Sequence, residues 1–207
     1  MEEFSNNLKL SDKNTVHSYL QIYDNLFTRF KNKDVNMIEV GTSNGGSIAL
    51  WNYYFNNAKI YGVDIIDSKL MIDEIVNKDN IILFNSTDGY DINFVTENFI
   101  NKNIKFDILI DDGPHTLQSM KDFIKLYLPL IKDNGILVIE DIPLGIPNKP
   151  KQPLMSVGGP DFKKELLECV KENFPEYMDY LEIKDLRNIK NRYDDVLLII
   201  DLKKNIL

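Results

Sequence analysis

Short apolar runs alternate with helix-like segments along most of this chain. The expected elements are, in chain order, a helix at 14–31, a strand at 35–40, a helix at 47–55, strands at 59–65 and 80–89, a helix at 91–100, a strand at 105–113, a helix at 116–131 and a strand at 136–142. Because parallel strands need crossover connections, this alternation predicts βαβ units and a mostly parallel sheet. The strand runs are continuously apolar, which indicates that helices cover both faces. The chain is therefore expected to be an α/β protein.

The C-terminal part departs from this alternation. Five of the eight prolines lie between residues 143 and 160, so this Pro/Gly-rich segment predicts an irregular loop, which we expect to border a substrate. Residues 161–174 return to helical periodicity, and 180–186 with 194–202 predict two strands that pair antiparallel at the sheet edge. The expected result is a seven-stranded sheet in a single domain over 1–207, with residues 1–34 as an N-terminal helical cap.

Charge and composition argue against several classes of partner. The net charge is −8, and a nucleic-acid backbone needs a basic surface, so we expect no nucleic-acid partner. No apolar run approaches the roughly 20 residues that cross a bilayer, and the polar N-terminus does not resemble a secretory signal. The single cysteine, Cys169, fits a reducing, cytoplasmic compartment and is expected to pack in the core. A homo-oligomer is compatible with these features.

Each expected parallel strand ends in a polar group. These groups are, in chain order, the turn at 41–44, Asp64, Asp88, Asp111 with Asp112, and Glu140 with Asp141. Ligands of open parallel sheets bind outside the carboxyl ends of the strands. Asp64 lies 23 residues beyond Gly41, where a carboxylate can accept hydrogen bonds from both ribose hydroxyls. A nucleoside-bearing cofactor is therefore expected, and a capped strand end is the alternative.

The glycine spacing of "EVGTSNGGS" (39–47) separates two cofactors. A dinucleotide fingerprint needs a second glycine where Ser43 stands, so a pyrophosphate would meet a side chain there. Together with Asp64 and Asp88, the stretch resembles the first motif, E/D-x-G-x-G-x-G, of the Rossmann-like class I S-adenosylmethionine-dependent methyltransferases. The resemblance implies that Asp64 binds the ribose of S-adenosylmethionine. It also assigns to the cofactor site Glu39, Gly41, Thr42, Ser43, Gly45, Ser47, Thr87, Asp88 and Asp111.

Two acidic motifs, "IDDGPH" (110–115) and "VIEDI" (138–142), are expected to end on neighbouring strands. Four converging carboxylates repel one another unless a cation neutralises them, and three carboxylate oxygens with waters and substrate suit Mg²⁺. Solvated carboxylates at a crevice mouth are the alternative. His115 follows Asp112 by three residues. A metal-bound hydroxyl has a lowered pKa, and a histidine beside it can take the proton, so His115 is a candidate base. A helix cap is its other interpretation.

The motifs "EVGTSNGGS", "YGVDI", "IDDGPH" and "VIEDI", in this order, are similar to those of the metal-dependent sugar O-methyltransferases of macrolide biosynthesis, the mycinamicin type. They also resemble the cephalosporin-hydroxylase-like methyltransferases, from about Thr15 to Ile142. The resemblance implies that Mg²⁺ or another divalent cation is held by Asp112, Glu140 and Asp141, with Asp112 and His115 catalytic. It further implies an N-terminal "H-x-Y" helix over the cofactor, matched by His17 and Tyr19.

The expected activity is methyl transfer from S-adenosylmethionine to a hydroxyl of a sugar or glycosylated small molecule, which includes nucleotide-sugar and glycan acceptors. Two alternatives stay open. One is a metal-independent methyltransferase that acts on a small molecule or a protein, and insensitivity to a chelator would select it. The other is a non-catalytic nucleotide- or NAD-binding module. The serine at position 43 argues against NAD, and the full set of acids with His115 argues against a non-catalytic relative.

Overall fold

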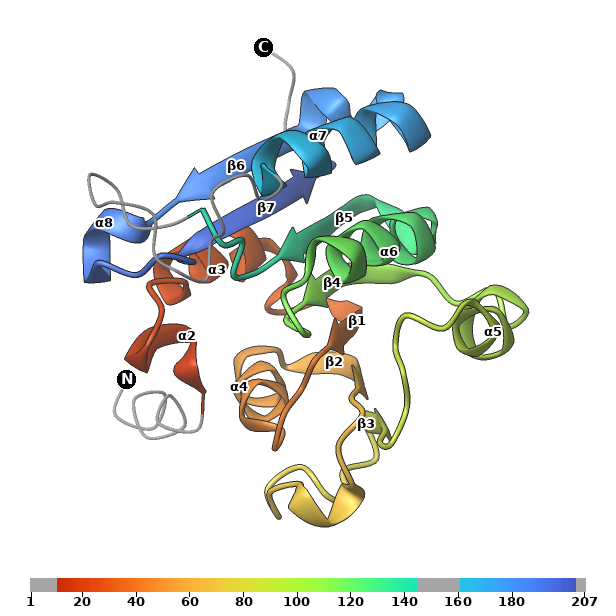
Figure 1. Ribbon diagram of the computed structural model, residues 1–207. Coiled ribbons are helices and arrows are strands. Elements are labelled where there is room, and N and C mark those ends of the chain that lie inside the picture. The colour runs from red at the N-terminus through yellow and green to blue at the C-terminus, as the bar shows by residue number, and fades with distance from the viewer. Residues whose placement is uncertain (1–10, 145–160, 204–207) are drawn as a thin grey trace.

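The computed structural model describes residues 11–144 and 161–203, and a seven-stranded sheet forms the centre of this described part (Figure 1). Its strands are β1 Asp34–Val40, β2 Asn57–Val63, β3 Ile81–Phe84, β4 Phe106–Asp111, β5 Ile131–Ile139, β6 Leu181–Asp185 and β7 Val196–Asp201. The spatial order is β3-β2-β1-β4-β5-β7-β6. Strands β1 to β5 pair in parallel, and β7 is antiparallel to both β5 and β6. The α/β fold with an antiparallel C-terminal edge is confirmed.

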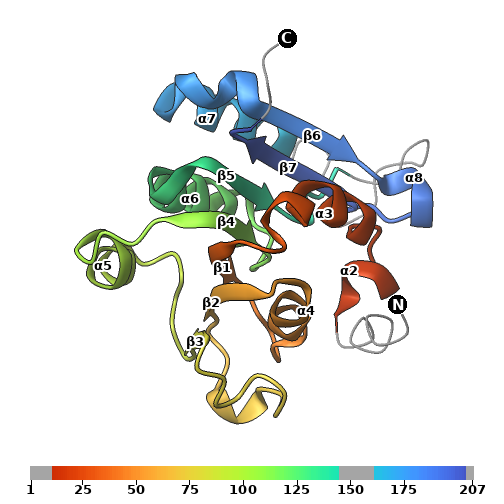
Figure 2. The same cartoon turned by 180° about the vertical axis from the view of Figure 1, so that it is seen from behind.

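Helices cover both faces of the sheet. The α-helices are α2 Asp12–Thr15, α3 Leu20–Phe27, α4 Gly46–Tyr54, α5 Ile92–Val95, α6 Leu117–Tyr127, α7 Phe162–Asn173 and α8 Arg187–Lys190. The 3-10 and π-helical turns are η2 Thr28–Phe30, η3 Ser68–Leu70, η4 Thr96–Ile100, η5 Leu128–Leu130 and η6 Pro175–Tyr180. Helices α3 and α4 pack on one face, seen from behind in Figure 2, and α5, α6 and α7 pack on the other. Neighbouring strand residues therefore enter different cores: Met37 joins the α3/α4 core and Ile38 the α6/α7 core.

The parallel register places the carboxyl ends of the central strands at one edge of the sheet. Val40 at the end of β1 pairs with Val63 of β2 and with Asp111 of β4. Asp111 pairs in turn with Ile139, the last residue of β5. The segments that follow these four strands therefore start at one level. This alignment brings together polar groups that are far apart in the sequence.

Most predicted elements end within one or two residues of the observed ones, and three differ more. The strand expected at 80–89 is only β3, because Ser86 adopts a left-handed backbone (φ 53°) and turns the chain. The strand expected at 136–142 begins earlier, at Ile131, because a register shift opposite β4 keeps 134–135 inside the strand. The helix expected at 91–100 is α5 followed by the π-helical turn η4.

The helix predicted over 14–31 was wrong in its continuity. The structure has α2, then a non-helical turn at 16–19, then α3 and η2. In that turn the amide N–H of Tyr19 donates to the carbonyl of Lys13, which leaves helical geometry. The helical cap at 1–34 and the single domain remain predictions, since residues 1–10 lie outside the described part. Most of the predicted loop at 143–160 also lies outside it.

Two smaller expectations can be compared with the described residues. Cys169 is buried in α7 within the α6/α7 core, so the prediction of a packed thiol is confirmed. Burial raises the pKa of this thiol. None of the helices in residues 11–144 and 161–203 is both long and apolar enough to cross a membrane.

Candidate active site

The turn after β1 has a shape that depends on glycine. Gly41 has φ of +90°, and a Cβ there would lie 2.0 Å from the backbone oxygen of Asp112. Gly45 has φ of +93° and caps the start of α4. Ser43 also has positive φ, 48°, and its amide N–H donates to Asp64 Oδ2 at 2.7 Å. The turn after β1 and the carboxylate after β2 are thus joined directly.

A cavity of about 870 Å³ opens beside this turn. This is within the usual range of about 300–1,000 Å³ for small-molecule sites. Of the residues predicted to bind cofactor or to act in catalysis, those that line it are Gly41, Thr42, Ser43, Ser47, Asp64, Thr87, Asp88, Asp112 and His115. The predicted residues outside its lining are Glu39, Gly45, Asp111, Glu140, Asp141, His17 and Tyr19. The assignments of all these residues, inside and outside the lining, to cofactor, catalysis or metal stay predictions.

Asp64 is fixed in the cavity wall by backbone donors. Its Oδ2 accepts from Ser43, and its Oδ1 accepts from the amide N–H of Ile66 at 3.0 Å. The amide N–H of Thr87 donates to the carbonyl oxygen of Asp64 at 2.9 Å, which brings the loop after β3 alongside. A carboxylate oxygen has more than one acceptor direction, so these bonds orient Asp64 and leave capacity for a ligand's hydroxyls.

Asp111 is buried and is not among the residues that line the cavity. Its carboxylate is buried, and Tyr90 Oη donates to Oδ1 at 2.5 Å. Burial raises the pKa of Asp111 to about 8, although the bond from Tyr90 opposes the shift. The structure therefore gives Asp111 a position that supports Tyr90, which does line the cavity.

Asp112, His115 and Asp141 form what we call the acid–histidine cluster. His115 Nε2 lies 3.8 Å from Asp112 Oδ1 and 3.7 Å from Asp141 Oδ2. One ligand atom from each of the three residues lies within 4.8 Å of the other two. Burial raises the pKa of Asp141 to about 6, with a further contribution from Asp112 and opposition from His17. Carboxylates that crowd in this way favour a nearby cation.

Glu140 faces in a different direction from the acid–histidine cluster. Its Oε1 accepts from Lys13 Nζ at 2.6 Å and from Tyr23 Oη. Burial, with Asp112 next in effect, raises the pKa of Glu140 well above its ordinary value, against the effect of Lys13. The predicted ligand set is therefore brought together only in part: Asp112 and Asp141 converge on His115, and Glu140 is engaged by Lys13.

Lys13 is a residue that the sequence did not single out. Its ammonium is fully buried and lies 2.8 Å from Asp112 Oδ2 and 3.3 Å from Glu39 Oε1. Burial lowers its pKa, but Asp112, Glu140 and Glu39 outweigh this and raise the pKa well above the usual range. Trp51 Nε1 holds the other oxygen of Glu39 at 2.6 Å. Lys13 directly precedes the predicted helix at 14–31 and carries no local sign of this role, since its partners belong to or follow three strands far along the chain.

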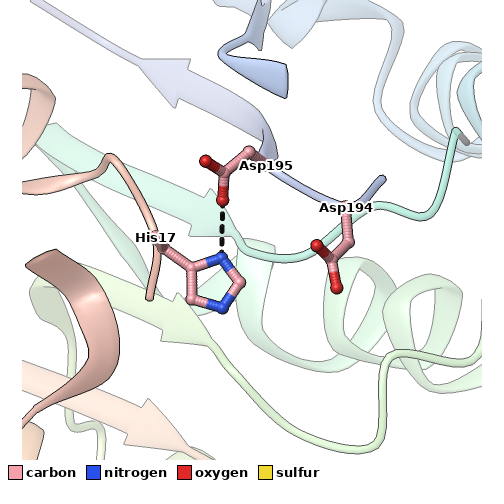
Figure 3. Close-up of side chains that lie close together, drawn as sticks. All are labelled: His17, Asp194 and Asp195. Carbon is pink, nitrogen blue, oxygen red and sulfur yellow. Dashed lines mark hydrogen bonds and ion pairs between the residues drawn. The ribbon is translucent and has the colours of Figure 1, made fainter. Parts of the chain in front are cut away.

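His17 and Tyr19 lie behind the acid–histidine cluster, against the loop before β7. His17 Nδ1 lies 2.6 Å from Asp195 Oδ1, the pair drawn in Figure 3, and 3.2 Å from Asp141 Oδ1. Tyr19 Oη donates to Asp141 Oδ1 at 2.5 Å. Asp194 also lies near His17, but Arg192 binds its carboxylate at 3.0 Å. The predicted "H-x-Y" pair thus orients Asp141 in this structure.

The acid–histidine cluster fits a divalent cation in its chemistry. It offers two carboxylate oxygens and an imidazole nitrogen; Asp112 and His115 line the cavity, and Asp141 is buried beside them. Oxygen ligands completed by water or substrate are the set that Mg²⁺ prefers. The turn at 41–47 with Asp64 fits a nucleoside in its chemistry, because residues of the turn and a carboxylate that can accept hydrogen bonds from hydroxyls line one cavity.

Comparison with curated proteins finds several O-methyltransferases among the relatives of this chain. Mycinamicin VI 2''-O-methyltransferase of Micromonospora griseorubida is 30% identical over 134 residues, which are 61% of this chain and 32% of that protein. An 8-demethyl-8-alpha-L-rhamnosyl tetracenomycin-C 2'-O-methyltransferase of Streptomyces olivaceus is 27% identical over 139 residues, 64% of this chain and 35% of that protein. The chain spans about a third of the length of these curated relatives. No protein-family model matches the chain.

A solved structure extends the likeness to the fold. The MycE methyltransferase from the mycinamycin biosynthetic pathway, in complex with Mg and SAH, superposes with a TM-score of 0.64 at 22% identity. The match covers 93% of this chain and 52% of that chain. The chain therefore has the class I methyltransferase fold, and in sequence it is similar to mycinamicin and tetracenomycin-C O-methyltransferases.

Proposed function

We propose that this protein is an S-adenosylmethionine-dependent O-methyltransferase that uses a divalent cation, Mg²⁺ first, to methylate a hydroxyl of a sugar or glycosylated small molecule. The acid–histidine cluster carries the proposal: Asp112 and His115 line the same cavity as the turn at 41–44 and Asp64. A methyl donor held by the turn would present its methyl group toward these side chains. The relatives' names supply the class of acceptor.

In this proposal, different residues bind the methyl donor, accept the proton and hold the cation. Asp64 and the turn at 41–47 bind and orient the nucleoside end of the donor, which brings donor and acceptor into one cavity. His115 is about one-third exposed, so its Nε2 can reach an acceptor hydroxyl and take its proton. Asp112 and Asp141 would hold the cation, and a bound cation would lower the pKa of a hydroxyl beside it. The acceptor oxygen then forms the new bond to the methyl carbon as the sulfonium bond breaks.

Two alternative functions, a metal-independent methyltransferase and a non-catalytic nucleotide-binding module, account for fewer features of the site. A metal-independent methyltransferase would lack a use for the convergence of Asp112 and Asp141 on His115. A nucleotide-binding module would lack a use for His115 in the cavity wall. We expect neither nucleic acid nor a membrane as partner, and we expect small glycosylated acceptors, nucleotide sugars and glycans to be the compounds to screen.

The test is methyl transfer from labelled S-adenosylmethionine to a panel of glycosides and nucleotide sugars, run with Mg²⁺ and with EDTA. We expect turnover only with the metal. His115→Asn is the matched variant, because asparagine tolerates the positive φ of 52° at this position. It should lower kcat by about 10²- to 10⁴-fold, the usual contribution of a general base. Full turnover in EDTA would select the metal-independent alternative, and wild-type kcat in His115→Asn would contradict the role of His115.

A further inference from the structure

Lys13 connects three strands through their carboxylates. Glu39 belongs to β1, Asp112 follows β4 and Glu140 follows β5, and all three lie within 3.3 Å of Lys13 Nζ. Lys13 itself comes from α2 and lies 127 positions before Glu140 in the sequence. An ammonium that is removed from water is stable only where such partners surround it. Its position therefore fixes the carboxylates as much as they fix it.

The two aspartates of the acid–histidine cluster each use one oxygen for this internal framework and one for the cluster. Asp112 turns Oδ2 to Lys13 at 2.8 Å and Oδ1 to His115 at 3.8 Å. Asp141 turns Oδ1 to Tyr19 at 2.5 Å and Oδ2 to His115 at 3.7 Å. The N-terminal segment thus holds the rear oxygen of each aspartate and leaves the front oxygen facing His115.

Glu140 is bound differently. Both Lys13 and Tyr23 bind the same oxygen, Oε1, and the side chain is almost fully buried. Its oxygens are absent from the group of three residues whose ligand atoms converge. Yet Glu140 is near that group, because its Oε1 and Asp112 Oδ2 share one ammonium. The bonds from Lys13 and Tyr23 thus hold Glu140 Oε1 outside that group.

We propose that Lys13 is a positioning residue that decides which carboxylates bind the divalent cation. Its ammonium serves as the counter-charge for Glu39 and Glu140 and keeps Glu140 out of the coordination shell. Asp112 Oδ1 and Asp141 Oδ2 are then the carboxylate ligands. The inference rests on the divalent-cation site of the proposed function, and it differs from the ligand set that the sequence motifs imply, in which Glu140 is a ligand.

The test is a double-mutant cycle in Mg²⁺ affinity, measured by calorimetry on the full chain without any substrate. The four proteins are wild type, Glu140→Gln, Lys13→Met and the double variant. With Lys13 present, Glu140→Gln should change the Kd by less than about threefold, because a non-ligand contributes little. With Lys13→Met, Glu140 is free to bind the cation, so adding Glu140→Gln should weaken binding by about tenfold or more.

Two results would overturn the inference. A tenfold loss of affinity in Glu140→Gln alone would show that Glu140 is a ligand while Lys13 is in place. An equally small effect of Glu140→Gln in both backgrounds would show that Lys13 does not control it. Should Lys13→Met fail to fold, the first of these still decides, because glutamine retains the acceptor that Lys13 and Tyr23 bind.

Two control variants separate this inference from the metal proposal. Asp141→Asn should weaken Mg²⁺ binding in either background, since its Oδ2 faces the cluster. If Asp141→Asn has no effect, or no protein binds Mg²⁺, the cation site itself is wrong and the inference fails with it. Lys132→Met removes a lysine from a pair with Asp107, 2.6 Å apart, at the amino ends of β5 and β4. It should leave Mg²⁺ affinity unchanged, because it lies at the opposite edge of the sheet.

Discussion

At the scale of single residues, two members of the acid–histidine cluster have unusual backbones. His115 has φ of 52° and Asp141 has φ of 55°, a region that costs most residues roughly 1–2 kcal/mol. At Asp141, hydrogen bonds on both sides hold the conformation: the amide N–H of Glu140 donates to Asp111 O at 2.9 Å, and that of Ile142 donates to Val196 O at 3.1 Å. Strain of this kind gathers at functional sites, where geometry outweighs local preference.

Asp111 gives a pH prediction at the same scale. Its pKa is about 8 in the folded protein and about 3.9 in an unfolded chain, so the folded state holds the proton more tightly. Its contribution to stability is therefore full below about pH 4 and is lost as the pH rises to about 8. Asp111→Asn keeps an oxygen for Tyr90 and cannot ionise. We expect its Tm to fall less than that of wild type between pH 5 and pH 8.5.

Thermal unfolding across this pH range measures the effect, without added metal. Asp133→Asn is the control, because Asp133 is exposed in β5 and should follow wild type. Parallel Tm curves for wild type and Asp111→Asn would contradict the account of Asp111 as a buried acid that holds its proton.

At the scale of elements, the N-terminal segment shows what hydrophobic periodicity does not predict. The apolar stripe at 14–31 predicted one helix, and Tyr19, Tyr23 and Phe27 are indeed buried. The helix is nevertheless interrupted at 16–19, where His17 and Tyr19 reach Asp141. Periodicity records which side chains are buried. It does not record that polar atoms of the same side chains will bind acids more than 100 positions away.

The turn after β1 was easier to predict from the sequence than the interruption of the N-terminal helix. Glycines and a following helical run identified it from sequence alone, because positive φ and close approach of two backbones are local demands of the chain. Gly41→Ala should therefore be severe: its Cβ would meet backbone atoms of Asp112 at 2.0 Å, and φ is +90°. We expect a loss of at least about 2 kcal/mol in the free energy of unfolding, measured with denaturant.

Gly62→Ala provides the matched comparison for this element. Gly62 lies in β2, its φ lies outside the left-handed region, and its Cβ would meet only side-chain methyl groups at 3.0 Å. We expect its cost to be clearly smaller than that of Gly41→Ala. Equal losses of stability in the two variants would show that the backbone of the turn is not the constraint we describe.

At the scale of the whole molecule, the sheet explains which parts of the site were predictable. Alternating elements predicted the parallel strands, and the rule that ligands bind at carboxyl ends gathered Asp64, Asp112 and Asp141. Lys13 could not be predicted in this way, since its bond to Glu140 spans 127 positions and its bond to Asp112 spans 99. The direction that Glu140 faces depends on that lysine. Motifs locate acids at one edge of the sheet, and the folded packing shows which partners each acid contacts.

The central claim is that the cavity beside the turn at 41–47 binds S-adenosylmethionine and its product. Calorimetric titration with S-adenosylhomocysteine, in Mg²⁺ and again in EDTA, tests it most directly. We predict binding in both conditions, near micromolar Kd or about −8 kcal/mol, and an approximately tenfold or greater loss in Asp64→Ala. Absence of binding, NAD binding in its place, or unchanged affinity in Asp64→Ala would contradict the cofactor assignment and the function built on it.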